Sequence, residues 1–167
     1  TRTFGFSSPK KNIKGVFTKV LKGHIAVVNS NLNKDNTGKK IDIHARKFLK
    51  KDNLDYAHGT GHGVGFFLNV HEGPQSISKI NEVELKEGMI LSNEPGYYKK
   101  NKFGIRIENL VYIKRYNRKI FFENLTMAPI EKKLINFKLL SSSEKNYLFK
   151  YHLKVYTNIS KYLNFKE

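Results

Sequence analysis

Residues 58–65 hold four glycines in eight positions, and the spacing of apolar residues differs on the two sides of this stretch. Before it, apolar side chains recur at three- and four-residue steps, which is typical of amphipathic helices. After it, apolar and polar side chains alternate along short runs, which is typical of strands. The order of helix, helix, glycine-rich loop, antiparallel strands and helix predicts an α+β domain.

Three helices are expected from these patterns. Two precede the glycine-rich loop, over residues 11–29 and 42–51, where apolar side chains form a stripe along one side. The third is expected over residues 141–164, because Ser141 is a favourable cap and Glu144 places an acidic side chain in the first turn.

Four strands are expected after the loop, over residues 89–94, 103–113, 119–122 and 127–131. The run 103–113 is the longest, and its apolar and polar side chains alternate almost throughout. Short polar turns separate the runs, so antiparallel pairing of neighbours is the simplest arrangement.

The carboxylates of Glu94 and Glu108 are expected to face each other. If residues 90–98 and 104–112 form a hairpin that turns at 100–102, these two glutamates are directly opposed. Opposed residues of an antiparallel pair project to the same face, with Cβ atoms about 5 Å apart. A bulge at the bend that follows Glu94 would shift this register by one residue.

Two carboxylates on one inward face would repel each other unless a cation lies between them. The chain has no cysteine, so any metal here must be held by His, Asp or Glu. Three histidines, His58, His62 and His71, crowd the stretch just before the strands. Two carboxylates and a neutral imidazole form an oxygen-rich site with one nitrogen, which suits a divalent metal.

Residues around this pattern also have expected roles. Arg106 alternates with Glu108, so it is expected to contact a metal-bound carboxylate, with a plain surface salt bridge as the alternative. Tyr97 and Tyr98 are expected to line the core or the substrate pocket. Structural roles are expected for three lone histidines on helices, His24, His44 and His152.

The net charge of +17 raises the question of a nucleic-acid partner. The lysines are spread along the chain in pairs, and Lys, Asn, Ile, Phe and Tyr are abundant together, which indicates a compositional bias. We therefore expect no nucleic-acid partner. No run approaches the eighteen apolar residues of a membrane span, so no membrane association is expected. The first residue is Thr1 rather than Met, which suggests a piece of a longer protein.

A family resemblance rests on three runs of residues. They are HGTGHGVGFFLNVHEGP at 58–74, GMILSNEPGYY at 88–98 and FGIRIEN at 103–109. They closely resemble the cytosolic aminopeptidase P family of eukaryotes, which is the Xaa-Pro aminopeptidase branch of the pita-bread metallopeptidases. The resemblance continues through residues 20–26 and 151–153, so it covers essentially the whole chain.

This resemblance implies a curved antiparallel sheet flanked by helices, with two divalent metal ions. The ions are usually manganese, with zinc or cobalt as alternatives. His62, Glu94 and Glu108 match the family's metal ligands. Glu94 also matches the residue that assists proton transfer, and Glu108 matches the residue that bridges the metals. His58 and His71 match two histidines that contact the substrate without binding metal.

The family's two aspartate ligands have no match here. In relatives they lie in a DGTTD-like strand just before a TRT segment, and this chain begins with TRT. The resemblance therefore implies that residues 1–167 are the C-terminal portion of a catalytic domain. Either a companion chain supplies the missing strand, or the chain is an inactive fragment.

The implied function is metal-dependent removal of the residue that precedes a proline at the second position. The implied partners are peptide substrates, the remainder of the same enzyme and a second copy in a homodimer, and the implied location is the cytoplasm. Two alternatives stay open. One is a prolidase-like dipeptidase of the same fold, although prolidases typically carry VHD where this chain has VHEGP. The other is a non-catalytic basic binding module on this scaffold.

Overall fold

The computed structural model describes residues 1–67 and 69–164, so position 68 and the last three residues of the expected 1–167 domain lie outside it. The helices are α1 (Lys11–Val28), α2 (Gly38–Lys50) and α3 (Ser142–Ile159). The strands are β1 (Gly61–His62), β2 (Ser76–Ile77), β3 (Ile90–Asn93), β4 (Gly96–Lys99), β5 (Phe103–Arg106), β6 (Asn109–Tyr116) and β7 (Lys119–Asn124). Short 3-10 turns lie at Lys132–Leu134, Phe137–Leu139 and Ser160–Tyr162.

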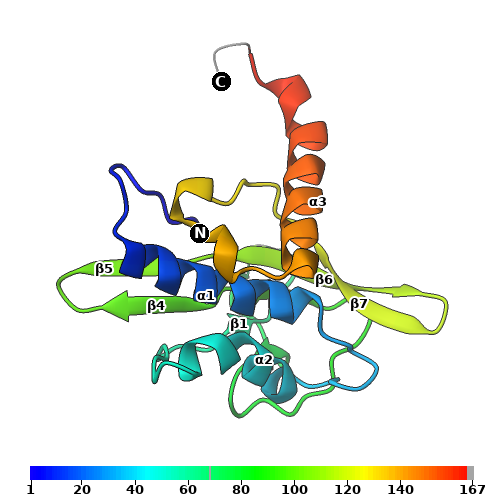
Figure 1. Ribbon diagram of the computed structural model, residues 1–167. Coiled ribbons are helices and arrows are strands. Elements are labelled where there is room, and N and C mark those ends of the chain that lie inside the picture. The colour runs from blue at the N-terminus through cyan, green and yellow to red at the C-terminus, as the bar shows by residue number, and fades with distance from the viewer. Residues whose placement is uncertain (68, 165–167) are drawn as a thin grey trace.

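The strands form three small antiparallel sheets, which confirms the α+β class. One sheet has the order β3-β6-β7, and the others are the pairs β1-β2 and β4-β5. The helices α1 and α2 pack against each other, and α3 stands at the far end of α1 with its C-terminal turns directed away from the sheets (Figure 1). Within the described residues, no helix is both long and apolar enough to cross a lipid bilayer.

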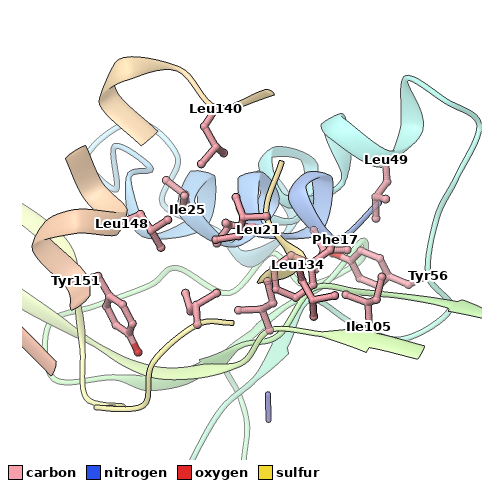
Figure 2. Packing of buried hydrophobic residues seen from close by; sticks show 14 of the residues in the cluster. Phe17, Leu21, Ile25, Leu49, Tyr56, Ile105, Leu134, Leu140, Leu148 and Tyr151 are labelled. Atoms are coloured by element: carbon pink, nitrogen blue, oxygen red, sulfur yellow. The ribbon is translucent and has the colours of Figure 1, made fainter. Parts of the chain in front are cut away.

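The core forms along α1, whose apolar stripe contacts both the strands and α3. One cluster joins Phe17 and Leu21 of α1 to Ile105 of β5 and Leu148 of α3 (Figure 2). A second cluster lies under the three-stranded sheet and contains Val27, Val28, Leu32, Ile41, Ala45, Ile77, Leu85, Leu91, Val111, Ile113 and Phe122. The two clusters hold the strands rigidly behind the glycine-rich loop.

The expected register of the strands is confirmed. Pairing runs from Ile90 opposite Tyr112 to Asn93 opposite Asn109, and resumes with Gly96 opposite Arg106. No residue is inserted between the two paired regions, so no bulge shifts the register. The Ile107 N–H still donates to the Pro95 carbonyl at 3.3 Å across the interval.

The single long strand expected over 103–113 is wrong, because it is interrupted between β5 and β6. Proline has no N–H, so Pro95 cannot complete the ladder there. The N–H of Glu108 donates instead to the carbonyl of Thr1 at 3.1 Å. The interruption coincides with the two glutamates of interest.

The strand expected over 127–131 is also wrong. Pro129 removes a donor from this segment, and side chains replace the ladder. Arg2 donates to the carbonyls of Ala128 and Pro129, and the N–H of Ile130 donates to Nε2 of His152. The segment is therefore anchored without belonging to a sheet.

The helix ends differ from the expected ranges at two places. The second helix begins at Gly38, four residues earlier than expected, because Thr37 precedes it in extended conformation. The third ends at Ile159 and continues as a 3-10 turn, so the helix does not extend over 141–164. At its start, Ser141 and Glu144 form the expected capping box.

Candidate functional site

The glycine-rich loop lies directly against strand β3. A Cβ atom placed on Gly61 would come within 1.8 Å of the carbonyl oxygen of Ser92. The backbone N–H of His62 donates to Oγ of Ser92 at 2.9 Å, and Gly63 bridges to Leu91. Only glycine allows this approach, so the loop sequence fixes His62 beside β3.

His62 presents one ring nitrogen to a carboxylate. Its Nδ1 lies 2.9 Å from the carbonyl oxygen of Gly63, and its Nε2 lies 3.3 Å from Oε1 of Glu94. In the neutral tautomer selected by the Gly63 contact, Nδ1–H is the donor and Nε2 carries a lone pair. A lone pair facing a carboxylate oxygen makes a site that attracts a shared cation.

Glu94 is buried and held on both sides. Its Oε1 accepts a hydrogen bond from Oγ of Ser92 at 2.8 Å, and its Oε2 lies 3.4 Å from Nη1 of Arg106. Its backbone N–H donates to the carbonyl of Thr60 at 2.8 Å. The carboxylate is therefore aimed by β3, by the loop and by the neighbouring strand together.

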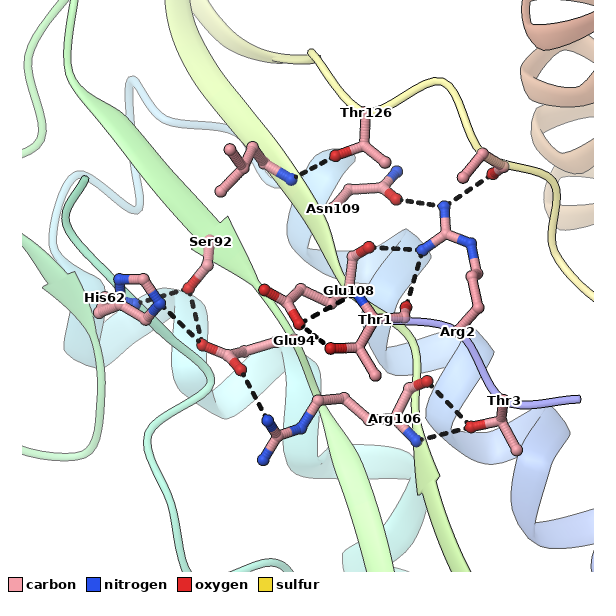
Figure 3. A network of polar contacts seen from close by, with 12 residues as sticks. Thr1, Arg2, Thr3, His62, Ser92, Glu94, Arg106, Glu108, Asn109 and Thr126 are labelled. Carbon is pink, nitrogen blue, oxygen red and sulfur yellow. Dashed lines mark hydrogen bonds and ion pairs between the residues drawn. The ribbon is translucent and has the colours of Figure 1, made fainter. Parts of the chain in front are cut away.

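Glu108 stands at the register position opposite Glu94, but its carboxylate is bonded to the start of the chain (Figure 3). Its Oε2 accepts a hydrogen bond from the hydroxyl of Thr1. Burial would raise the pKa of Glu108, but these Thr1 contacts outweigh it and lower the pKa below its ordinary value. Among the described residues, no three His, Asp or Glu side chains lie close enough to hold one metal ion.

His58 is placed by a chain of polar contacts. Its Nδ1 lies 2.6 Å from the carbonyl of Gly59, and its Nε2 lies 2.8 Å from the hydroxyl of Tyr98. Nε of Arg106 donates to that same hydroxyl at 2.7 Å, so Tyr98 accepts from Arg106 and donates to His58. Through Arg106, this chain of contacts reaches Glu94.

The remaining candidates differ in their placement. His71 is exposed, and its ring centroid lies 4.1 Å from that of His62. Tyr97 packs against the hydrophobic core and lies 6.1 Å, between ring centroids, from Phe103. The structure therefore brings His71 to the site and turns Tyr97 toward the core.

The lone histidines have different surroundings from those of this group. His44 contacts Asp35, and Nε2 of His152 accepts a backbone N–H. His24 is fully buried in α1, and neither ring nitrogen has a hydrogen-bond partner of ordinary geometry among the described residues. Burial, reinforced by the charge of Arg2, lowers the pKa of His24 to about 3.

Sequence reasoning missed the buried polar residues behind the loop. Arg46 and Asp42 are each 1% exposed, and Thr60 is fully buried. The i, i+4 spacing of Asp42 and Arg46 on one helix was a signal for an ion pair, but such pairs are usually at the surface. Ser92, which bonds both His62 and Glu94, was missed as well.

Two family models match the chain in succession. The model for metallopeptidase family M24 matches residues 1–115. The model for the C-terminal region of that peptidase family matches residues 118–167.

Curated relatives carry peptidase names. "Probable Xaa-Pro aminopeptidase P" of Laccaria bicolor is 46% identical over 171 residues, which cover 96% of this chain and 27% of the relative. "Aminopeptidase P2" of Arabidopsis thaliana is 47% identical over 170 residues, covering 96% of this chain and 24% of the relative. The chain thus spans about a quarter of the length of these relatives.

Solved structures agree on the fold. The X-prolyl aminopeptidase of Caenorhabditis elegans, described as a cytosolic enzyme with a di-nuclear active site, superposes with a TM-score of 0.88 at 38% identity. That match covers 97% of this chain and 28% of the other. A prolidase from Pyrococcus furiosus superposes with a TM-score of 0.66 at 33% identity, over 75% of this chain and 35% of the other. The chain therefore has part of the pita-bread fold.

Proposed function

Because the chain belongs to metallopeptidase family M24, we propose that it is the C-terminal catalytic portion of a metal-dependent aminopeptidase that hydrolyses an N-terminal Xaa-Pro bond. One observation carries the proposal. Nε2 of His62 faces the carboxylate of Glu94 at 3.3 Å, on strands whose register places Glu108 opposite. The names of the relatives supply the substrate class.

The residues present fit a divalent metal in their chemistry. His62, Glu94 and Glu108 would hold it, because one imidazole nitrogen and several carboxylate oxygens suit manganese, zinc or cobalt. We propose that the intact enzyme binds two divalent ions and that manganese is the metal. When bound, such ions activate water and polarise the scissile carbonyl.

The proton steps fall to this chain's own side chains. Glu94 would carry a proton toward the leaving nitrogen of proline, with its carboxylate aimed by a hydrogen bond from Ser92 and an ion pair with Arg106. His58 would contact the substrate, and Tyr98 and Arg106 orient its ring through the contact at Nε2. His71, exposed beside His62, would contact the substrate.

The two aspartate ligands of the family are proposed to come from residues that precede Thr1 in the intact enzyme. The segment Thr1–Thr3 lies along β5, since Thr1 bonds Glu108 and Oγ1 of Thr3 bonds the backbone of Arg106. A residue joined to Thr1 would therefore start beside the Glu108 carboxylate. The contacts of Thr1 and Thr3 support a site that is shared with the residues proposed to precede them.

A homodimer and a cytoplasmic location complete the proposal. Both come from the family resemblance, and the solved Caenorhabditis elegans relative is described as cytosolic. Size measurement and imaging of the intact protein test them independently of catalysis.

The decisive experiment uses the intact, metal-stripped enzyme. We expect no turnover before metal is added, and cleavage of a Xaa-Pro-Xaa tripeptide after manganese is restored. A matched Xaa-Ala-Xaa tripeptide should stay uncut. Preferential cleavage of a Xaa-Pro dipeptide would indicate a prolidase instead. No metal-dependent cleavage of any of the three would leave the binding-module alternative and refute the proposal.

A further inference from the structure

The guanidinium of Arg46 is buried directly behind the glycine-rich loop. Its Nε donates to Asp42 at 2.7 Å, and its Nη1 donates to Asp55 at 2.6 Å and to the carbonyl of Tyr56 at 2.7 Å. The guanidinium carbon also lies 3.9 Å from the centroid of the Tyr56 ring. Together with Thr60, these residues are called the Arg46 cluster below.

Stability alone does not account for an arginine at this position. Removing two opposite charges from water costs free energy that their attraction barely repays, and an apolar side chain would fill the space as well. Burial would lower the pKa of Arg46, but Asp42 and Asp55 outweigh it and raise the pKa. Burial would likewise raise the pKa of Asp55, yet Arg46 and Lys79 lower it to about 2. Arg46 and Asp55 therefore both carry their charges across ordinary pH.

One branch of the cluster reaches His58. Nη2 of Arg46 donates to the carbonyl of His58 at 2.7 Å, so the guanidinium fork grips the carbonyls of residues 56 and 58 together. The glycines that follow leave the loop few restraints of its own. The grip thus sets the backbone from which the His58 ring extends to Tyr98.

A second branch reaches Glu94. Oγ1 of Thr60 donates to Oδ1 of Asp42 at 2.5 Å, while Oδ2 of the same carboxylate accepts from Arg46. The carbonyl of Thr60 in turn accepts the backbone N–H of Glu94 at 2.8 Å. Asp42 and Thr60 therefore join the buried guanidinium to the start of the bend that carries the Glu94 carboxylate.

We propose that Arg46 is a positioning residue for the reaction, acting on His58 through its carbonyl and on Glu94 through Asp42 and Thr60. This inference rests on the proposed function. Only a planar fork with several donors can hold both branches, and a lysine offers a single point charge. Arg46→Lys therefore keeps the charge and removes the geometry.

The test compares Arg46→Lys with Arg115→Lys in the intact enzyme. Arg115 bonds Glu87 at the surface, so the same substitution there is the matched control. We expect Arg46→Lys to lower kcat about 10- to 100-fold while KM changes less than about threefold, because misplaced catalytic groups weaken the chemical step more than binding. Arg115→Lys should keep the kcat of the wild type.

The imidazole NMR signature of His58 is the second readout, and it does not depend on turnover. In the wild type we expect a single tautomer with the proton on Nδ1, and in Arg46→Lys a mixture. A variant with a lower melting temperature but unchanged His58 signature and kcat would overturn the inference. If Arg46→Lys does not fold, Asp55→Asn, which removes the negative charge bonded directly to Nη1 of Arg46, decides by the same two readouts. An inactive wild-type enzyme would refute the proposed function. The His58 NMR signature does not need turnover, so a comparison of the wild type with Arg46→Lys would still test the positioning role.

Discussion

The glycine-rich loop has two sides, and their polar groups are satisfied in different ways. Behind it, the Arg46 cluster is buried, and its carboxylates, hydroxyls and guanidinium bond one another and the loop carbonyls. In front of it, His62, Glu94 and Glu108 form what we call the ligand face. Here Nε2 of His62 faces a carboxylate 3.3 Å away, and Glu108 is bonded to Thr1.

The Arg46 cluster is therefore a structural support, whereas the ligand face is the proposed metal site. The cluster reaches its full set of contacts within the described residues, so it has a defined geometry without any ligand. At the ligand face, Nε2 of His62 is directed toward a carboxylate oxygen of Glu94, and we propose that a metal ion binds there. Changes at the ligand face should therefore act on metal and turnover, and changes outside the cluster, at exposed residues such as Lys79, should act weakly on both.

The largest effect is expected for Glu108→Ala in the intact enzyme. Turnover should fall by at least about four orders of magnitude, because the proposed bridge between the metals disappears. Metal analysis should show less metal per protein. The matched control is Glu123→Ala, which removes a carboxylate paired with Lys114 and Lys154 on the outer strand. Full metal content in Glu108→Ala would show that Glu108 is not a metal ligand.

A smaller effect is expected for His58→Ala and His71→Ala. Each should lower kcat by about two to four orders of magnitude, the range for a lost proton-transfer or oxyanion group. Metal content should stay near that of the wild type, since neither side chain is a proposed ligand. Metal loss in His71→Ala equal to that in His62→Ala would show that the division between ligands and substrate contacts is wrong.

The pH dependence of stability should reveal His24. The pKa of His24 is about 3 in the folded protein, so between pH 6.5 and 3 the unfolded chain binds a proton that the folded chain excludes. The free energy of unfolding should therefore fall as pH falls through this window, by up to about 1.4 kcal/mol per pH unit.

Denaturant unfolding of the metal-free enzyme from pH 7 to pH 4 measures this slope, and stripping the metal separates it from metal loss. His24→Leu, which has no titrating ring, should show a flatter dependence over the same range. In the wild type, the imidazole signals of His24 should not titrate between pH 7 and pH 5. An equal slope in both proteins would assign the acid sensitivity to other groups.

The smallest effect is expected at the rim of the Arg46 cluster. Lys79 donates to Asp55 from an exposed position, at 3.0 Å. Lys79→Ala should change the free energy of unfolding by no more than about 0.5 kcal/mol and leave kcat unchanged, because exposed ion pairs contribute little. Unfolding curves and steady-state kinetics check both. A large loss of kcat would show that Lys79, at the surface, also takes part in positioning the catalytic groups.

The register of the glutamates was predictable from the sequence, because alternation and a short turn leave few ways to pair two strands. The interruption between β5 and β6 was not predicted, since it depends on the lack of an N–H at Pro95 and on a bond from Glu108 to Thr1. The strand expected around Pro129 failed for a related reason. Its backbone bonds to distant side chains, including Arg2, that no local pattern reveals.

The Arg46 cluster could be predicted only in part. The spacing of Asp42 and Arg46 indicates an ion pair, but an arginine on a charged helix is usually exposed. Its burial depends on Asp55 and on the carbonyls of Tyr56 and His58, which lie beyond the helix. Tertiary contacts of this kind carry no periodic signal, whereas the histidines and glutamates of the ligand face stood out by their type and crowding.

The contact between Gly61 and the Ser92 carbonyl has a mechanical consequence. The backbones that carry His62 and Glu94 lie in direct contact at Gly61 and Ser92, and the Ser92 hydroxyl bonds both neighbouring residues. The glycine-rich loop and β3 are therefore expected to move together. Any separation of the loop from β3 would therefore move the His62 ring away from the Glu94 carboxylate.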